Sequence, residues 1–217
     1  MILAPTQGRT YNLFHMPLRM IDLQQARINT AGAYVSIDGL YPFAIGIRPH
    51  NGKLPIVRLG GHREEHETGW KCAVREVYEE ARLAIHPVTP QTTYLVDWDD
   101  LDGELHEIHW TRDIETEPIP LLLLTYSREG KTSLSLMYLA EAEGTPLPSS
   151  EVKGLLLLTP EDIQQLCHEP QTLERYLNRG GRAILQAEFN MQLLLEPFAQ
   201  LRILSRLLRL QSELNTI

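Results

Sequence analysis

One segment of this chain, residues 68–82, constrains its fold more than any other. Apolar side chains recur in it at intervals of four, three and four positions, which is the spacing of one buried face on an α-helix. These side chains are Trp70, Val74, Val77 and Ala81. Thr68 precedes them as the expected N-cap, because its hydroxyl can accept a hydrogen bond from a free amide of the first turn. The segment therefore predicts an amphipathic helix that must pack on a hydrophobic partner.

Strand-forming sequence on both sides of this helix supplies the partner. Short apolar runs are separated by turn chemistry such as Asp38-Gly39 and residues 50–53. The predicted strands lie at residues 33–37, 42–47, 54–59, 92–98, 105–110, 121–126, 133–140 and 155–158. Pro160 opens a short helix, and from Pro170 onward the strand pattern gives way to helical stretches. The chain therefore predicts a mixed α/β domain followed by a helical tail.

The charge balance limits the functions open to such a domain. The 217 residues include 20 Lys and Arg against 28 Asp and Glu, which gives a formal net charge of −8. This acidity argues against a non-specific nucleic-acid binder, whose basic surface must neutralise many phosphates. It leaves room for an anionic substrate, because a divalent cation can lie between the substrate and the protein.

The cellular compartment is predicted from patterns that the sequence lacks. Its first residues have no continuous apolar stretch with a small-residue cleavage site, the pattern of a secretory signal peptide. The leucine-rich runs are far shorter than the roughly 20 residues that span a bilayer. The two cysteines, Cys72 and Cys167, are too few to stabilise the chain through disulfide bonds. Each is expected to be a small buried side chain. We therefore expect a cytoplasmic protein without a membrane partner.

The polar face of the central helix carries the chemistry. Glu76, Glu79 and Glu80 stand at i, i+3 and i+4, so their carboxylates project from one side of the helix. Glu64 and Glu67 add two more carboxylates near the first turn. Clustered hard oxygens suit Mg²⁺ or Mn²⁺, which are held by few carboxylates together with waters and phosphate oxygens. The plain alternative is a solvated acidic helix face.

Two glycines favour the metal interpretation over the solvated face. Gly60 and Gly61 end the strand before the acidic loop. Because they have no side chains, the backbone could approach a phosphate chain closely there. A glycine strand end, an acidic loop and a capped helix together therefore indicate a metal-assisted phosphate site.

This segment resembles the Nudix box, Gly-x5-Glu-x7-Arg-Glu-U-x-Glu-Glu-x-Gly-U, in which U is aliphatic. The chain matches it at Gly61, Glu67, Arg75, Glu76, Val77, Glu79, Glu80 and Leu83. Arg82 stands where the family has a glycine after the helix. It either takes the left-handed conformation at a cost of roughly 1 kcal/mol or lets the helix continue. His66 also stands where many relatives have glycine, which would stiffen the loop.

The resemblance implies a fold and an activity. The fold is a Nudix-type α/β/α sandwich around a mixed β-sheet at residues 31–167, with an N-terminal segment at 1–30 and a helical C-terminal extension at 168–217. The activity is Mg²⁺- or Mn²⁺-dependent cleavage of a nucleoside diphosphate linked to another moiety, as in ADP-ribose. The alternative is a Nudix-like regulator that binds a nucleotide without turnover. A Nudix-fold isomerase is disfavoured, because the chain has no convincing catalytic cysteine motif.

The resemblance also implies which residues hold the metal and the substrate. Glu76, Glu79 and Glu80 would bind the cation, and Glu64 is a further candidate ligand from the acidic loop. The backbone of residues 60–61, both glycine, would face the phosphates.

The resemblance leaves open which carboxylate is the general base. Glu79 or Glu80 would orient or deprotonate the attacking water in one reading, and Glu151 in another, because many Nudix enzymes have a glutamate in a corresponding segment. Glu151 could equally be a loop carboxylate in solvent. Arg75 is expected to orient Glu76 rather than to touch the substrate.

Two other features have simpler interpretations. The acids of residues 97–103 do not keep the spacing of a Ca²⁺-binding loop, so a hairpin turn is expected there. Arg202, Arg206 and Arg209 lie on one face of the last helix, but three arginines in an acidic chain are a weak footprint for nucleic acid. The tail is instead expected to pack on its own domain or on a second subunit of a homodimer.

Overall fold

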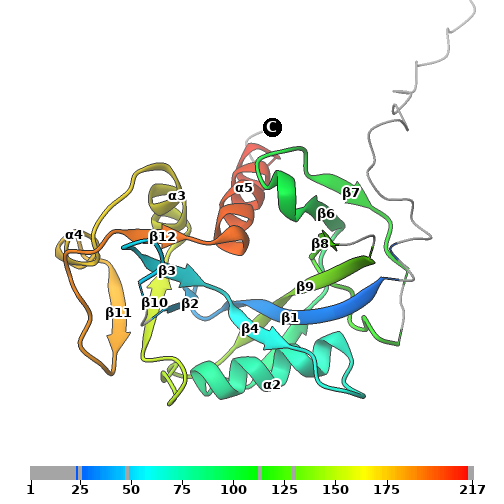
Figure 1. The fold of residues 1–217 in the computed structure, drawn as a ribbon, viewed down its shortest axis with the longest axis horizontal. Coiled ribbons are helices and arrows are strands. Elements are labelled where there is room, and N and C mark those ends of the chain that lie inside the picture. The colour runs from blue at the N-terminus through cyan, green and yellow to red at the C-terminus, as the bar shows by residue number, and fades with distance from the viewer. Residues whose placement is uncertain (1–22, 24–25, 47–48, 112–113, 129–130, 215–217) are drawn as a thin grey trace, which may run out of the picture.

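The computed structural model describes residues 23, 26–46, 49–111, 114–128 and 131–214, whose arrangement Figure 1 shows. Most of the predicted N-terminal segment at residues 1–30, namely residues 1–22 and 24–25, lies outside the described residues. Within the described ranges, no helix combines the length and the apolar character needed to cross a membrane.

Seven strands form the larger of two sheets. In spatial order they are β4 (Leu59–His62), β1 (Arg27–Ser36), β9 (Lys131–Ala142), β8 (Leu122–Arg128), β6 (Thr93–Asp97) and β7 (His106–Ile108), with β5 (Ile85–Val88) also paired to β9. β1 runs antiparallel to β4 and parallel to β9, so the sheet is mixed. β4, which carries Gly60 and Gly61, lies at one end of this order.

Five shorter strands form the second sheet. In spatial order they are β11 (Arg182–Leu185), β10 (Gly154–Leu158), β2 (Tyr41–Ile45), β3 (Leu54–Val57) and β12 (Leu195–Pro197). The two predicted turns beside β2 and β3 are present. Asp38 and Gly39 have φ of 49° and 76°, and Asn51 and Gly52 have φ of 50° and 73°. Positive φ at both central residues is what tight hairpins between twisted strands require.

Two helices lie on opposite sides of the larger sheet, α2 (Gly69–Ala81) on one side and α5 (Ala199–Leu214) on the other (Figure 1). Figure 1 also shows helices α3 (Pro160–His168) and α4 (Leu173–Asn178) beside the second sheet. Neighbouring residues of β1 enter opposite cores. Ala33 packs in the core under α2, whereas Tyr34 packs in the core that includes α5. The predicted α/β/α architecture around a mixed sheet is therefore confirmed.

The buried face of α2 differs slightly from the predicted one. Val77 and Ala81 are buried as expected, but Trp70 and Val74 are only partly buried. The other buried residues of the helix, Gly69, Cys72 and Ala73, are all small. Small side chains let the helix approach the sheet closely, so the larger Trp70 and Val74 lie at the margin of the contact.

The C-terminal extension contains two strands that the sequence did not predict, in addition to helices α4 and α5. β11 pairs with β10, and β12 runs parallel to β3. These strands have only three or four residues, and β12 includes Pro197, so neither shows a strand pattern by itself. The predicted packing of the tail on its own domain is present, since α5 contributes Leu201, Ile203 and Leu204 to the second core.

Candidate functional site

The central helix begins and ends at the predicted residues. Thr68 Oγ1 accepts a hydrogen bond from the Lys71 amide at 3.2 Å. At the other end, Arg82 takes the left-handed conformation with φ of 57°, and its N–H donates to the Tyr78 carbonyl at 3.0 Å. The first of the two alternatives for Arg82 is thus the one observed. His66 has φ of 69°, so it too adopts a backbone conformation that favours glycine.

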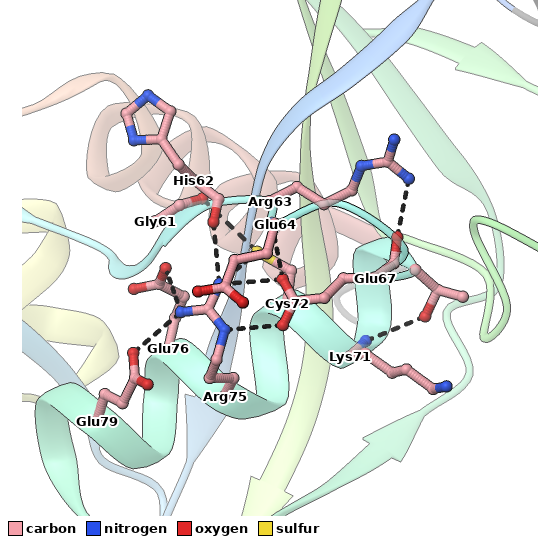
Figure 2. A network of polar contacts seen from close by, with 11 residues as sticks. Gly61, His62, Arg63, Glu64, Glu67, Lys71, Cys72, Arg75, Glu76 and Glu79 are labelled. Atoms are coloured by element: carbon pink, nitrogen blue, oxygen red, sulfur yellow. Dashed lines mark hydrogen bonds and ion pairs between the residues drawn. The ribbon is translucent and has the colours of Figure 1, made fainter.

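Arg75 is the centre of the polar network in Figure 2. Its Nε and Nη2 donate to the two carboxylate oxygens of Glu67 at 2.7 and 3.0 Å, a bidentate pair. Its Nη1 lies 2.9 Å from both Glu76 Oε1 and Glu79 Oε2. Nη2 also donates to the His62 carbonyl at 2.9 Å. Arg75 therefore contacts Glu76 as expected, and it also ties the helix to the preceding strand and loop.

Glu67 closes the loop between β4 and α2. Its Oε2 accepts a hydrogen bond from the Glu64 amide at 2.9 Å, and its carbonyl accepts one from Arg63 Nη1 at 2.8 Å. The hydrogen bond from Arg75 holds the pKa of the Glu67 carboxyl below its ordinary value. Glu64, the further candidate metal ligand, joins this network through its amide, and the residue is exposed.

Glu80 lies beside the glycines of β4 rather than beside Arg75. Its Oε2 accepts a hydrogen bond from the Gly60 amide at 2.7 Å. Burial raises the pKa of the Glu80 carboxyl to about 7, and the negative charges of Glu76 and Glu151 act in the same direction. A Cβ on Gly61 would lie 2.4 Å from the Glu76 carboxylate, so a side chain at this position would displace that carboxylate. The two glycines thus bring two helix carboxylates to one strand edge.

A partly buried arginine that the sequence did not single out lies next to this edge. Arg58 stands between β3 and β4, and its Nη1 is 2.5 Å from the point where a Cβ on Gly60 would be. Burial lowers the pKa of its guanidinium, while the charges of Glu80 and Glu76 oppose that shift. Arg58 is the one charged residue in the apolar run 54–59, which is the signal that could have identified it.

The segment before Glu151 packs on the C-terminal end of α2. The Leu147 amide donates to the Ala81 carbonyl at 2.8 Å, and the Ser149 amide donates to the Glu80 carbonyl at 3.2 Å. Two carbonyls that would lack partners at the helix end are thereby satisfied. Glu151 is exposed, yet its charge is close enough to affect the pKa of Glu80.

The carboxylates of this site suit a hard divalent cation, but Arg75 competes with a cation for two of them. Glu76 and Glu80 offer carboxylate oxygens at the same strand edge, and a cation there would relieve the unfavourable negative charge on the partly buried Glu80. Within the described residues, no three His, Cys, Asp or Glu side chains converge as a ready metal site. Because Arg75 holds Glu76 and Glu79, a cation would compete with it for these two carboxylates.

Cys72 is a buried structural residue, as predicted. Burial, with the charge of Glu67 as the next cause, raises the pKa of its thiol to about 11. Its Sγ donates to the Gly61 carbonyl at 3.7 Å. A protonated thiol in this position is a poor nucleophile. Cys167 is partly rather than fully buried, and burial raises the pKa of its thiol as well.

Comparison with known proteins finds matches among solved structures. The chain is similar to Nudix hydrolases of known structure. One from Clostridium perfringens is 21% identical with a TM-score of 0.42, over 64% of this chain and 84% of that chain. A MutT Nudix hydrolase from Burkholderia pseudomallei is 18% identical with a TM-score of 0.39, over 64% and 86%. A C. elegans Ap4A hydrolase is 20% identical with a TM-score of 0.37, over 62% and 82%. No family model and no curated protein matches.

Proposed function

We propose that the chain is a Nudix-type hydrolase that uses Mg²⁺ or Mn²⁺ to cleave the diphosphate linkage of a nucleoside diphosphate joined to another moiety. The observation that carries this proposal is the meeting of two helix carboxylates with the glycines of β4. The Glu76 carboxylate fills the space that a Cβ of Gly61 would need, and Glu80 accepts a hydrogen bond from the Gly60 amide. Carboxylate oxygens beside bare backbone suit a cation that in turn binds phosphate.

The helix carboxylates would hold the cation. Glu76 and Glu80 are the first candidates, and Glu79 would join them on leaving Arg75. When bound, the cation would polarise phosphate oxygens and lower the pKa of a water molecule. The backbone at residues 60–61 would lie against the phosphates, where a side chain would prevent a close approach.

Proton removal from the attacking water falls to a nearby carboxylate. Glu79, Glu80 and Glu151 are the candidates, and Glu151 is exposed at the end of the segment that packs on α2. Arg75 acts as a positioning residue, because its contacts with Glu67 fix the guanidinium that in turn orients Glu76. Such indirect partners commonly account for roughly 10- to 100-fold in metal affinity or activity.

Hydrolysis assays on a substrate panel test the proposal. The panel contains ADP-ribose, NADH, dinucleoside polyphosphates and nucleoside triphosphates, each with Mg²⁺ and with EDTA. We expect metal-dependent nucleotide or phosphate release from at least one member. Glu76→Gln and Glu80→Gln should each lower kcat/KM by roughly 10²- to 10⁴-fold while circular dichroism stays unchanged. The matched control is Glu174→Gln, which removes an exposed carboxylate on α4 and should leave activity unchanged.

Two results would contradict the proposal. Full activity in both folded glutamine variants would show that these carboxylates do not hold the cation. Saturable nucleotide binding without turnover of any panel member would replace the hydrolase with the regulator.

A further inference from the structure

Arg58 lies between β3 and β4, just before the segment that resembles the Nudix box. Its Nη1 is 2.5 Å from the point where a Cβ on Gly60 would be. Gly60 pairs with Gly32 of β1, and the same Cβ would lie 2.4 Å from the Gly32 Cα. The guanidinium therefore lies close to a stretch of bare backbone, where neither of the two paired residues carries a side chain.

The Arg58 guanidinium has no hydrogen-bond or ion-pair partner among the residues that the structure describes. Arg75 differs, because Glu67 and two helix carboxylates hold it. In the same described ranges, the fully buried side-chain nitrogen and oxygen atoms without a partner belong to Tyr138 and Gln171. Arg58 is not among them, so its unpartnered N–H groups reach solvent and can donate to a ligand.

Glu80 of α2 contacts the same glycine without pairing with Arg58. Its Oε2 accepts a hydrogen bond from the Gly60 amide at 2.7 Å. Burial lowers the pKa of the Arg58 guanidinium, and the charge of Glu80 is the largest effect that opposes this shift. An arginine remains protonated in such surroundings. A positive and a negative group therefore flank Gly60.

This arrangement suits a phosphate group whose charge is shared between two cations. The carboxylates of Glu76 and Glu80 repel phosphate by themselves, but a divalent cation bound to them attracts it. Arg58 supplies a further positive charge beside Gly60, and its planar guanidinium can donate two parallel hydrogen bonds to phosphate oxygens. The glycine backbone between these groups leaves room for a close approach. A neutral ligand would use neither charge.

We propose that Arg58 is a catalytic residue that binds a phosphate oxygen of the substrate's diphosphate beside Gly60. This inference rests on the proposed function, because it takes the diphosphate to lie at the glycines of β4. A preorganised guanidinium stabilises the negative charge of the phosphoryl oxygens during cleavage as well as in the bound substrate. The role differs from that of Arg75, which is held by carboxylates and positions Glu76.

Titration calorimetry tests the phosphate contact without turnover. The probe is methylenediphosphonate, a diphosphate analogue that has no base and a bridge that resists cleavage, with Mn²⁺ present. We expect saturable binding to the wild type. Arg58→Met removes the charge and the N–H groups and should weaken binding roughly 10- to 150-fold, as expected for a lost hydrogen bond to a charged group. The control is Arg182→Met, which changes an exposed arginine on β11 and should bind as the wild type does.

Binding of Mn²⁺ alone separates a phosphate contact from a supporting role. A guanidinium near Glu80 repels a cation, so Arg58→Met should bind Mn²⁺ at least as tightly as the wild type. If Arg58 instead only held the carboxylates in place, its loss would weaken Mn²⁺ and methylenediphosphonate binding together. That parallel loss would overturn the proposal.

A second variant keeps the proposal testable if Arg58→Met does not fold. Arg58→Lys retains the charge but cannot form two parallel hydrogen bonds, so it should bind methylenediphosphonate roughly three-fold or more weakly at unchanged Mn²⁺ affinity. Wild-type affinity for methylenediphosphonate in Arg58→Lys would contradict the bidentate contact. Circular dichroism and urea denaturation establish which variants are folded.

Steady-state kinetics on the best substrate of the panel separate this inference from the proposed function. Folded Arg58→Met should lower kcat/KM roughly 10- to 150-fold, and Arg182→Met should not. Binding of methylenediphosphonate that depends on Arg58, without turnover of any panel member, would overturn the hydrolase and support the phosphate contact. Turnover with unchanged kcat/KM in folded Arg58→Met, or a wild type that does not bind methylenediphosphonate, would overturn the contact while the hydrolase stands.

Discussion

Arg82 illustrates how one residue can close a helix in a conformation that suits glycine. Its φ of 57° places it in the left-handed region, which costs a residue with a side chain roughly 1–2 kcal/mol. In return, its N–H satisfies the Tyr78 carbonyl at 3.0 Å. Its guanidinium also lies over the Tyr78 ring, 5.4 Å from the centroid, a contact worth about 0.5–1 kcal/mol at an exposed site. The contact with the ring offsets part of the backbone strain.

Substitutions at this position separate strain from stacking. Arg82→Gly and Arg82→Ala both remove the contact with Tyr78, but only glycine relieves the left-handed strain. We expect the glycine variant to exceed the alanine variant in free energy of unfolding by about 1 kcal/mol, measured by urea denaturation. Equal stabilities would show that φ at this position carries no cost.

Side-chain contacts hold the short strand β12 in position. It has three residues and runs parallel to β3. Glu196 lies 2.9 Å from His50 Nδ1 and 3.4 Å from Lys53 Nζ, which belong to the turn before β3. His50 also packs edge-on against Phe198, with centroids 5.5 Å apart. These contacts attach the chain before α5 to the second sheet.

The Glu196 cluster predicts a pH-dependent contribution to stability. The hydrogen bond with His50, followed by that with Lys53, lowers the pKa of the Glu196 carboxyl from its ordinary 4.5. A carboxyl whose pKa is lower in the folded chain stabilises the fold above pH 4.5, and this contribution is lost as the pH falls through the folded pKa. Because the partners are largely exposed, we expect about 0.2–1 kcal/mol.

Denaturation of the wild type and Glu196→Gln at about pH 6 and about pH 3 measures this contribution. The variant should be less stable at the higher pH and equal at the lower one. The control is Glu143→Gln, which changes an exposed carboxylate outside the cluster and should have a similar small effect at both pH values. A stability difference that persists at the lower pH would show that packing, not charge, explains the effect of Glu196.

At the scale of the whole molecule, the C-terminal extension is part of the packed structure, because it covers one face of the larger sheet. The larger sheet has an apolar surface on both faces, and α2 covers only one of them. On the other face, Tyr34 Oη donates to the Gln200 carbonyl at 2.8 Å, and Leu201 and Ile203 are fully buried. Removal of α5 would therefore expose the second core to water.

A single core substitution in α5 tests this view in the full-length chain. Leu204 is 3% exposed, so Leu204→Ala should lower the free energy of unfolding by about 2–5 kcal/mol. Leu210→Ala is the control, because Leu210 is 37% exposed on the same helix and should cost far less. Truncation after Glu169 should leave no stable monomer. A truncated monomer of unchanged stability would refute the packing role of the tail.

Features of this protein that depend on residues close together in the chain could be predicted from the sequence. A threonine hydroxyl can reach an amide three positions later, and an Asn-Gly pair accepts positive φ at both positions, so the cap at Thr68 and the turn at Asn51-Gly52 were predictable. The fixed geometry of a helix likewise placed Glu76 and Glu80 on one side, before any tertiary contact was known.

Tertiary structure decided which group each of these side chains meets. Arg75 contacts Glu67 across the loop, Glu80 turns to the Gly60 amide, and Trp98 meets Tyr126 because β6 and β8 lie side by side. β12 joins β3 from a distant part of the chain. The physical reason is that burial and partner choice depend on strands that pair over long sequence separations. Helix periodicity and turn preference, which the sequence alone determined, are set within about four neighbouring residues.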